Sequence, residues 1–199
     1  MSKVFFTFDA MKSIIEINLR EAREVLDEFL SQPGNIGAVE KAAKLLIETI
    51  KSGKKIISCG NGGSMTDAMH FAEELTGLFR DKRQALPAIS ISDPSHITCV
   101  ANDIGFEEVF SRYIEGVGQE GDALLAITTS GNSMNIIRAV EAAREKGMKV
   151  VGLTGKTGGL LSGMVDAEIR ISGRKYSDRI QEVHIKVLHI LVTLIEREL

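Results

Sequence analysis

The chain has 199 residues, enough for one well-buried core but short for two domains of ordinary size. Its 44% hydrophobic and 26% charged residues are typical of a globular protein and argue against a collagen-like, disordered or disulfide-stabilised chain. The formal net charge of −3 supplies no basic excess, so we expect no nucleic-acid partner, and a small anion has to be held by local geometry.

The start of the chain and its cysteines bear on location. The apolar stretch Val4–Phe8 ends at Asp9, too early for the core of a signal peptide, and we interpret it as a short extension. No apolar run approaches the roughly 18 residues of a membrane span. Cys59 and Cys99 lack metal-type spacing and indicate no disulfide framework. We therefore predict a cytoplasmic protein with no membrane partner.

Two amphipathic helices are predicted first. Apolar residues recur at three- and four-residue steps over 11–30, and a second helical pattern covers 36–51. The segment 31–35, which contains proline and glycine, separates the two helices, and Gly53 ends the second.

Short apolar strands alternate with helices after that point. We expect strands at 54–60, 88–91, 123–127, 149–153 and 167–171, with helices from 64 to about 78, around 94–116, at 133–146, near 158–164 and from about 178. Parallel neighbours need long return connections, so this alternation predicts an α/β protein with a doubly wound five-stranded parallel sheet. Ligands of such sheets bind beyond the carboxyl ends of the strands, where the strand order reverses.

Two glycine- and serine-rich turns connect predicted strands to helices. The first is Cys59–Ser64, and the second is Thr128–Ser133, in which we expect Ser133 to cap the next helix. Free backbone N–H groups at a helix start favour an anion, and neither turn has the lysine of a nucleotide-binding P-loop, which favours a monophosphate. Each turn alone could be a tight connection and nothing more. Two of them on the first and third strands of one sheet indicate an anion site.

Ionisable side chains follow in two predicted helices. His70 and Glu74 are four residues apart and project from one face, a spacing shared by metal sites, proton-transfer pairs and ordinary solvated faces. The last helix is apolar around most of its circumference, so Gln181, His184 and His189 need partners in a packed environment. A core histidine satisfied by one hydrogen bond is the alternative for either imidazole. Such a helix, together with the N-terminal one, also predicts packing against another subunit.

Several of these segments form a specific combination, although each one alone is unspecific. They are Ser58–Ser64, Asp67–Gly77, Ala101–Asp103, Thr129–Ser133 and Asp178–His189. Together they resemble the sugar isomerase (SIS) domain family, and within it the sedoheptulose 7-phosphate isomerases, also called phosphoheptose isomerases. The resemblance covers nearly the whole chain. It implies a flavodoxin-like SIS fold as a single domain over 1–199, with N-terminal helices at 1–52, a sheet core at 53–175 and a C-terminal helix at 176–199.

The resemblance also implies a reaction, a metal and an assembly. The reaction converts sedoheptulose 7-phosphate into D-glycero-D-manno-heptose 7-phosphate in heptose and lipopolysaccharide biosynthesis, with Glu74 as the base on carbon, His189 as the acid and base on oxygen, and no nucleotide or redox cofactor. One Zn²⁺ per subunit is held by His70, Glu74, Gln181 and His189, in a homotetramer whose core contains the N- and C-terminal helices. The implied substrate contacts are Asn61, Gly62, Gly63, Ser64, Glu74, Asn102, Asp103, Thr128, Thr129, Ser130, Ser133 and Gln181.

Two features of this implied site leave alternatives open. A carboxylate that ligates zinc is a weaker base, so Glu74 can hardly serve fully in both roles. Gln181 and His189 are eight residues apart, about 12 Å along an ideal helix. Either Gln181 precedes the regular helix, or neighbouring subunits share the site.

The chain departs from the family at Leu78, where many members carry a basic residue, so Arg80 or Arg83 would have to make any substrate contact of that residue. A rival interpretation is a non-catalytic SIS protein that serves as an oligomeric binding platform, which would have no need of the ionisable set. Another is a SIS-type regulator, or an isomerase of a sugar of different length. A regulator would normally add a DNA-binding module, for which we find no segment.

Overall fold

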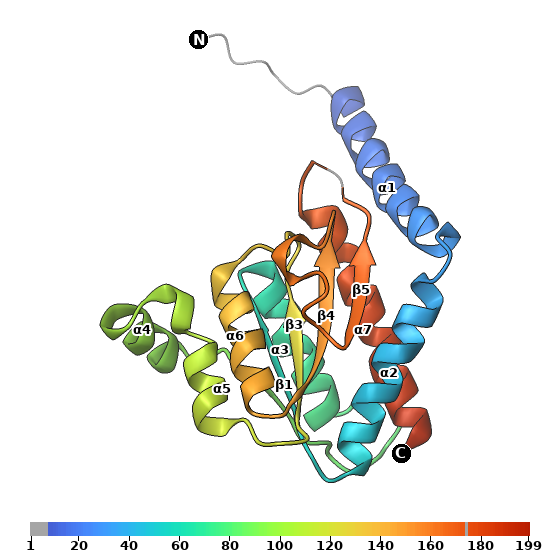
Figure 1. Cartoon of the computed structure of the whole chain (residues 1–199). Helices are drawn as coiled ribbons and strands as arrows, with labels where there is room; N and C mark the ends of the chain where they lie inside the picture. The colour runs from blue at the N-terminus through green and yellow to red at the C-terminus, as the bar shows by residue number, and fades with distance from the viewer. Residues whose placement is uncertain (1–7, 174) are drawn as a thin grey trace.

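Five parallel strands form the central sheet in residues 8–173 and 175–199, the part of the chain that the computed structural model describes (Figure 1). They are β1 (Ile56–Gly60), β2 (Ala88–Ser90), β3 (Ala123–Ile127), β4 (Lys149–Gly155) and β5 (Ala167–Ile171). Their order is β2-β1-β3-β4-β5, and every neighbouring pair is parallel. The predicted doubly wound α/β sheet is therefore confirmed.

The strand order reverses between β1 and β3. β2 lies on the outer side of β1, whereas β4 and β5 continue beyond β3, so the chain leaves the two central strands in opposite directions. The register pairs Gly60 with Ile127, the last residue of each strand. Because the two strands end level with each other, the segments that follow them begin side by side at the edge where ligands of such sheets bind.

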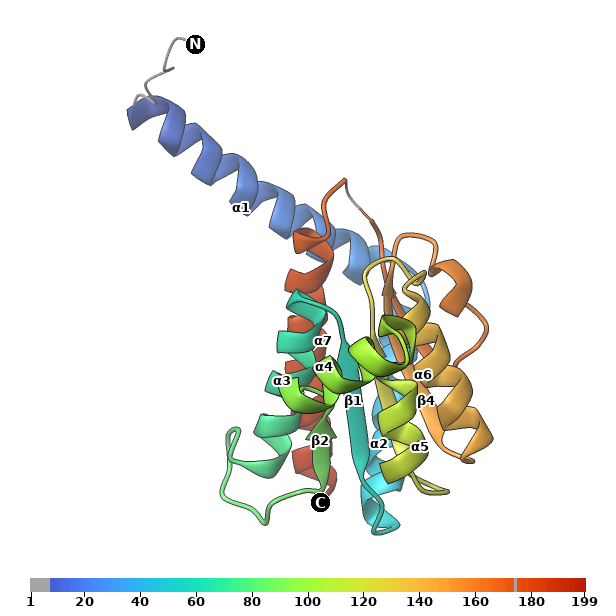
Figure 2. The same ribbon diagram turned by 90° about the vertical axis from the view of Figure 1, so that its left-hand side faces the viewer.

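Helices cover both faces of the sheet (Figure 2). The helices packed on one face are α2 (Asn35–Lys51), α3 (Gly63–Thr76) and α7 (Asp178–Glu198), joined by the end of α1 (Phe8–Ser31). The helices on the other are α4 (Pro94–Asp103), α5 (Ser111–Val117) and α6 (Met134–Glu145). Two short 3₁₀ helices, η1 (Phe106–Glu108) and η2 (Gly159–Leu161), complete the described elements.

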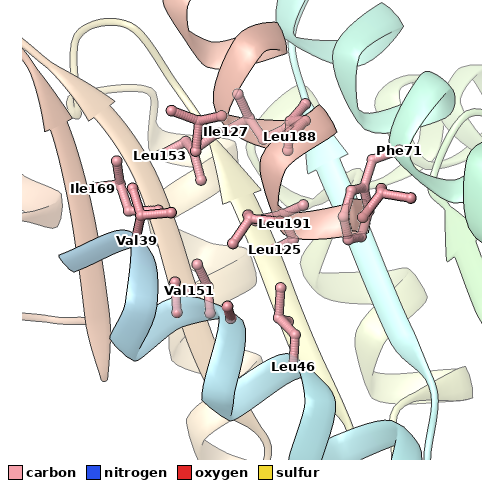
Figure 3. Packing of buried hydrophobic residues seen from close by; sticks show 14 of the residues in the cluster. Val39, Leu46, Phe71, Leu125, Ile127, Val151, Leu153, Ile169, Leu188 and Leu191 are labelled. Atoms are coloured by element: carbon pink, nitrogen blue, oxygen red, sulfur yellow. The ribbon is translucent and has the colours of Figure 1, made fainter. Parts of the chain in front are cut away.

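The side chains of β3 show how one strand serves two cores. Leu124 belongs to the cluster under α5 and α6, whereas its neighbour Leu125 belongs to the cluster under α2 and α7. Successive residues of a strand point to opposite faces, and both of these are fully buried, as expected in a parallel sheet covered on two sides. Figure 3 shows Leu125 on the face where Leu46 of α2 and Leu191 of α7 pack.

Two predicted element boundaries were wrong, and glycines account for one of them. The helical stretches expected around 94–116 are α4, η1 and α5, and Gly105, with φ 143°, separates the first two. The helix expected near 158–164 shrinks to η2, since Gly158 and Gly159 both have positive φ. The first helix begins at Phe8, within the stretch interpreted as an extension; the rest of that stretch lies outside the described residues.

The first half of α1 projects beyond the sheet (Figures 1 and 2). Arg179 of α7 anchors the helix further along, through hydrogen bonds to Asn18 and to Glu21. The projecting part exposes several large apolar side chains, namely Phe8, Met11, Ile14, Ile15, Ile17 and Leu19. Within residues 8–173 and 175–199, no helix is both long and apolar enough to cross a membrane.

His184 joins α7 to the carboxyl end of β4. Its side chain is completely buried, and Nε2 lies 2.9 Å from the carbonyl oxygen of Thr154. Burial lowers the pKa of His184 to about 4, and the hydrogen bond to Thr154 only partly opposes this effect. This histidine is therefore the core residue with one hydrogen bond that the sequence allowed as an alternative; its buried Nδ1 has no partner among the described residues, and the side chain is neutral in the folded protein near pH 7.

We predict that His184 makes the protein less stable in mild acid. Below its ordinary pKa of about 6.5 the unfolded chain takes up a proton that the folded chain refuses until about pH 4, so stability falls as the pH drops through this window. A His184→Gln variant keeps a donor for Thr154 and has nothing to titrate. The free energy of unfolding of wild type relative to this variant should be constant above pH 7 and fall by roughly 2–3 kcal/mol between pH 6.5 and 4.5.

Urea unfolding at one fixed protein concentration, at pH 7.5, 6.0 and 4.5, measures this difference. Parallel pH profiles for the two proteins would contradict the prediction.

Candidate active site

The first turn leads from β1 directly into α3. Gly60 has to be glycine, because a Cβ there would lie 2.4 Å from the carbonyl oxygen of Ser64. Gly63 is less strictly constrained, since its Cβ would lie 2.6 Å from the side-chain amide of Gln181, which is the end of a flexible side chain. Gly62 adopts φ 54° and is exposed. The result is a tight turn with exposed backbone at the start of a helix, where unpaired N–H groups and the helix dipole favour an anion.

The second turn leads from β3 into α6. Within it, Thr128 Oγ1 accepts a hydrogen bond from the Gly131 N–H at 3.2 Å, and Ser130 Oγ accepts one from the Asn132 N–H at 3.2 Å. Ser133 stands at the position before α6, but its hydroxyl makes no cap, so that expectation was wrong. Its backbone carbonyl receives the first helical N–H groups instead. The Ser133 hydroxyl is thus not used to hold the helix and remains available to a ligand.

A pair of asparagines ties the two turns together. The Asn61 amide of the first turn donates to Asn135 Oδ1 at 2.9 Å, and the Asn135 amide donates back to Asn61 Oδ1 at 2.8 Å. Asn135 is buried in α6. Because each amide satisfies the other, the pair fixes the distance between the turns without drawing on a backbone N–H group from either one.

Two histidines and a glutamate converge between α3 and α7. Ligand atoms of His70, Glu74 and His189 all lie within 4.8 Å of one another. His70 Nε2 is 3.0 Å from Glu74 Oε1, and the rings of His70 and His189 meet edge to face with 5.1 Å between their centroids. The Glu74 side chain is only 15% exposed. The predicted i, i+4 pair therefore faces the last helix, with Glu74 the more buried member and the His70 side chain still 39% exposed.

Burial and neighbouring charges set the electrostatics of this cluster. Burial lowers the pKa of His189, and His70 lowers it further, whereas Glu74 acts in the opposite direction. Burial also raises the pKa of Asp67, one turn before His70, to about 6. The neighbouring Glu73 is exposed, and its carboxylate comes no closer than 3.8 Å to His70. The shielded carboxylate at the cluster is therefore that of Glu74.

The first turn and the cluster lie at different positions along α3 and α7. Gln181 contacts Gly63 at the start of α3, whereas His189, eight residues further along α7, contacts His70. α7 is unbroken from Asp178 to Glu198, so the alternative in which Gln181 precedes the regular helix was wrong. Gln181 stands beside the first turn, about 12 Å along the helix from His189. A metal site shared between subunits stays a prediction.

Other predicted site residues make contacts away from the two turns. Asn102 and Asp103 end α4 and are exposed, and the Asn102 amide donates to Asp103 at 2.6 Å rather than to either turn. Leu78 is exposed, and the guanidinium of Arg80 lies over the Phe79 ring. The remaining side chains of the predicted set lie in or next to the turns; they are Ser64, Thr128, Thr129, Ser130 and Ser133.

Sequence reasoning missed two residues that shape the site. Asn135 pairs with Asn61, and the Phe79 ring stacks on His189 with 5.6 Å between centroids. Asn135 follows the second turn by two residues, so its position next to a polar turn was a usable signal. Phe79 lies between Leu78 and Arg80, the two positions that the sequence analysis did single out.

Comparison with known proteins places this geometry among sugar-phosphate isomerases. Residues 19–155 match the SIS domain family, a region that includes both turns and all of α3. The phosphoheptose isomerase of Escherichia fergusonii is 60% identical over 188 residues, which cover 94% of this chain and 98% of that protein. The structure of phosphoheptose isomerase from Neisseria gonorrhoeae matches with a TM-score of 0.87 at 35% identity, covering 94% of this chain and 99% of that one. For the Francisella tularensis enzyme the TM-score is 0.83 at 36% identity, covering 99% and 100%.

Proposed function

We propose, on the premise that this chain belongs to the phosphoheptose isomerases of the SIS domain family, that Glu74 and His189 carry the proton transfers of a ketose–aldose isomerisation. The reaction converts sedoheptulose 7-phosphate into D-glycero-D-manno-heptose 7-phosphate. The observation that supports the two roles is the convergence of His70, Glu74 and His189 within 4.8 Å. A non-catalytic binding platform has no need of such a cluster.

The reaction needs proton transfers at carbon and proton transfers at oxygen. Glu74 takes a proton from C1 of the ketose, an enediol forms, and the proton returns to C2. His189 moves a proton between the two oxygens, which requires an imidazole that starts neutral, and its lowered pKa favours this form. His70 holds the Glu74 carboxylate at 3.0 Å and so limits its rotation. The phosphate end is held by the two turns, where fixed N–H groups suit a group whose charge stays constant.

The donor set of the cluster fits zinc. Two imidazoles and one carboxylate are ligands that catalytic zinc sites use, with a further position left for water or substrate. A bound zinc would polarise the sugar oxygens and stabilise the charge that develops on them. Gln181 would complete this set only from another subunit, because in its own chain it stands beside Gly63. A Glu74 carboxylate that ligates the metal would be a weaker base, so we infer that it moves between the two roles.

The first test concerns the base. Glu74→Gln keeps the shape of the side chain and removes its basicity, so we expect kcat to fall by about 10³-fold or more while the phosphosugar still binds. Glu73→Gln is the matched control, since it makes the same change one residue away on an exposed side chain, and it should retain activity. Turnover is measured with sedoheptulose 7-phosphate, and binding by calorimetry. A Glu74→Gln enzyme that turns over normally would exclude this base.

The second test concerns the metal. We expect purified protein dialysed against Zn²⁺ to retain about one ion per subunit, and His70→Ala to lose it, because the remaining two ligands hold zinc poorly. His96→Ala is the matched control, since His96 lies in α4 and contacts Val109 and Tyr113 instead. Atomic emission gives the zinc content directly. Equal zinc in all three proteins would place the metal elsewhere.

A homo-oligomer, and specifically a tetramer, is the assembly we propose for the single SIS domain. α1, α2 and α7 form an apolar groove of about 320 Å³. Its exposed side chains include Leu30, Ile36 and Ile190. Leu30 belongs to the last turn of α1, the helix whose first half projects. An apolar groove next to an apolar projecting helix is the arrangement expected where identical subunits pack together.

Sedimentation tests this assembly. We expect the wild-type protein to sediment as a tetramer at micromolar concentration, and Ile190→Glu to dissociate it by placing a charge in the groove. Ile104→Glu is the matched control, because Ile104 is comparably exposed at the end of α4. A wild-type monomer would refute the assembly, and dissociation by Ile104→Glu would place the interface on the other side of the molecule.

A further inference from the structure

Arg83 makes a three-way contact beneath the proton-transfer cluster. It lies in the segment between α3 and β2, and its side chain is 13% exposed. Its Nη2 donates to the Glu74 carbonyl at 2.5 Å, Nη1 donates to the Leu75 carbonyl at 2.8 Å, and Nε donates to Glu196 Oε1 at 2.8 Å. Glu196 belongs to α7 and is only 5% exposed. One guanidinium therefore joins the end of α3 to the end of α7.

This contact satisfies a carbonyl at the end of α3. α3 ends at Thr76, so the carbonyl of Glu74 belongs to the last turn, where no helical N–H group follows to pair with it. The Leu75 carbonyl accepts from Arg83 and also from the Leu86 N–H at 2.9 Å. A cation at this end also opposes the negative end of the helix dipole. Glu196 balances the charge of the largely buried guanidinium. Because these contacts use the Arg83 guanidinium, Arg83 is not available to replace the basic residue that many family members carry at the position of Leu78.

We propose that Arg83 and Glu196 are positioning residues for the proton transfer. Arg83 holds the backbone of Glu74 itself, and through Glu196 it fixes that backbone relative to the helix that carries His189. The segment it anchors also carries Phe79, whose ring stacks on His189. The inference rests on the roles proposed above for Glu74 and His189.

We call the contact of Arg83 with Glu196 and the end of α3 the clamp. Its position predicts which kinetic constant it controls. Arg83 and Glu196 act at the end of α3, whereas the phosphate turns lie at its start, eleven residues and about 16 Å away along the helix. Loss of the clamp should therefore misplace Glu74 and leave phosphate binding unchanged. A misplacement on the order of 1 Å can lower a rate by about 10²-fold.

Two variants separate positioning from folding. Arg83→Lys keeps the charge but offers a single ammonium, which cannot reach two carbonyls and a carboxylate in the geometry of the guanidinium. The double variant Arg83→Met with Glu196→Met removes both members of the ion pair, so neither charge is left buried and unpaired, although the Glu74 carbonyl loses its donor. Arg112→Lys is the matched control, because Arg112 pairs with Glu115 on the exposed surface of α5.

We expect both clamp variants to lose about tenfold or more in kcat, with KM for sedoheptulose 7-phosphate within about twofold of wild type. Both variants should stay fully folded at the assay temperature, and Arg112→Lys should match wild type throughout. A double variant with wild-type kcat would overturn the inference, as would a loss of kcat that only follows a loss of folded protein.

A second measurement does not depend on activity. The ring C–H signals of His70 and His189 in NMR spectra should shift in Arg83→Lys, whereas those of His96 should not. If the wild-type protein fails to isomerise the sugar while these shifts appear, the proposed function fails and the clamp stands. If the protein isomerises the sugar and the cluster signals stay unchanged in the variant, the clamp fails and the function stands.

Discussion

The parallel pairing of β1 with β3 is the contact on which the site depends. Neighbouring strands lie about 4.8 Å apart, and the register aligns Gly60 with Ile127, so the two polar turns start next to each other. The strand pairing alone brings the turns together, so the residues of the turns only have to maintain the distance between them. The amides of Asn61 and Asn135 do so, because each satisfies the other across the gap between the turns.

α3 and α7 extend the site away from the sheet edge. α3 begins at the first turn, α7 begins beside it, where Gln181 lies next to Gly63, and both helices carry ionisable groups two to three turns further on. A phosphate keeps its charge during an isomerisation, so rigid N–H groups and helix dipoles suit it. The sugar carbons exchange protons, which requires groups such as Glu74 and His189 that can change their protonation state. Under the function proposed above, the separation along the helices lets the phosphate end and the reacting carbons of the sugar lie against different side chains.

Local pattern was sufficient to predict most of the fold and only part of the site. Most strands are short apolar runs, β5 alternates apolar and charged residues, and His70 and Glu74 share a helix face through their four-residue spacing, so these features can be read from nearby residues. Helical segments are interrupted where a glycine adopts positive φ, as Gly105 does. The presence of a glycine in the sequence does not by itself fix that conformation. The contacts of Asn135 and Arg83 could not be predicted, since their partners are 74 and 113 residues away in sequence. Such pairings exist only once the sheet has brought the helices together.

The polar residues around the site fall into two groups that differ in whether their hydrogen bonds are already used. Asn135, His184 and Arg83 are buried or largely buried, and each holds a backbone or side-chain partner in another element. Breaking such a bond leaves a buried group unpaired, which costs more than the bond itself contributes, so these contacts define one arrangement of the helices. The Ser133 hydroxyl, by contrast, stands at a helix start without capping it. The buried contacts therefore hold the helices in place, and the Ser133 hydroxyl is free of any role in capping α6.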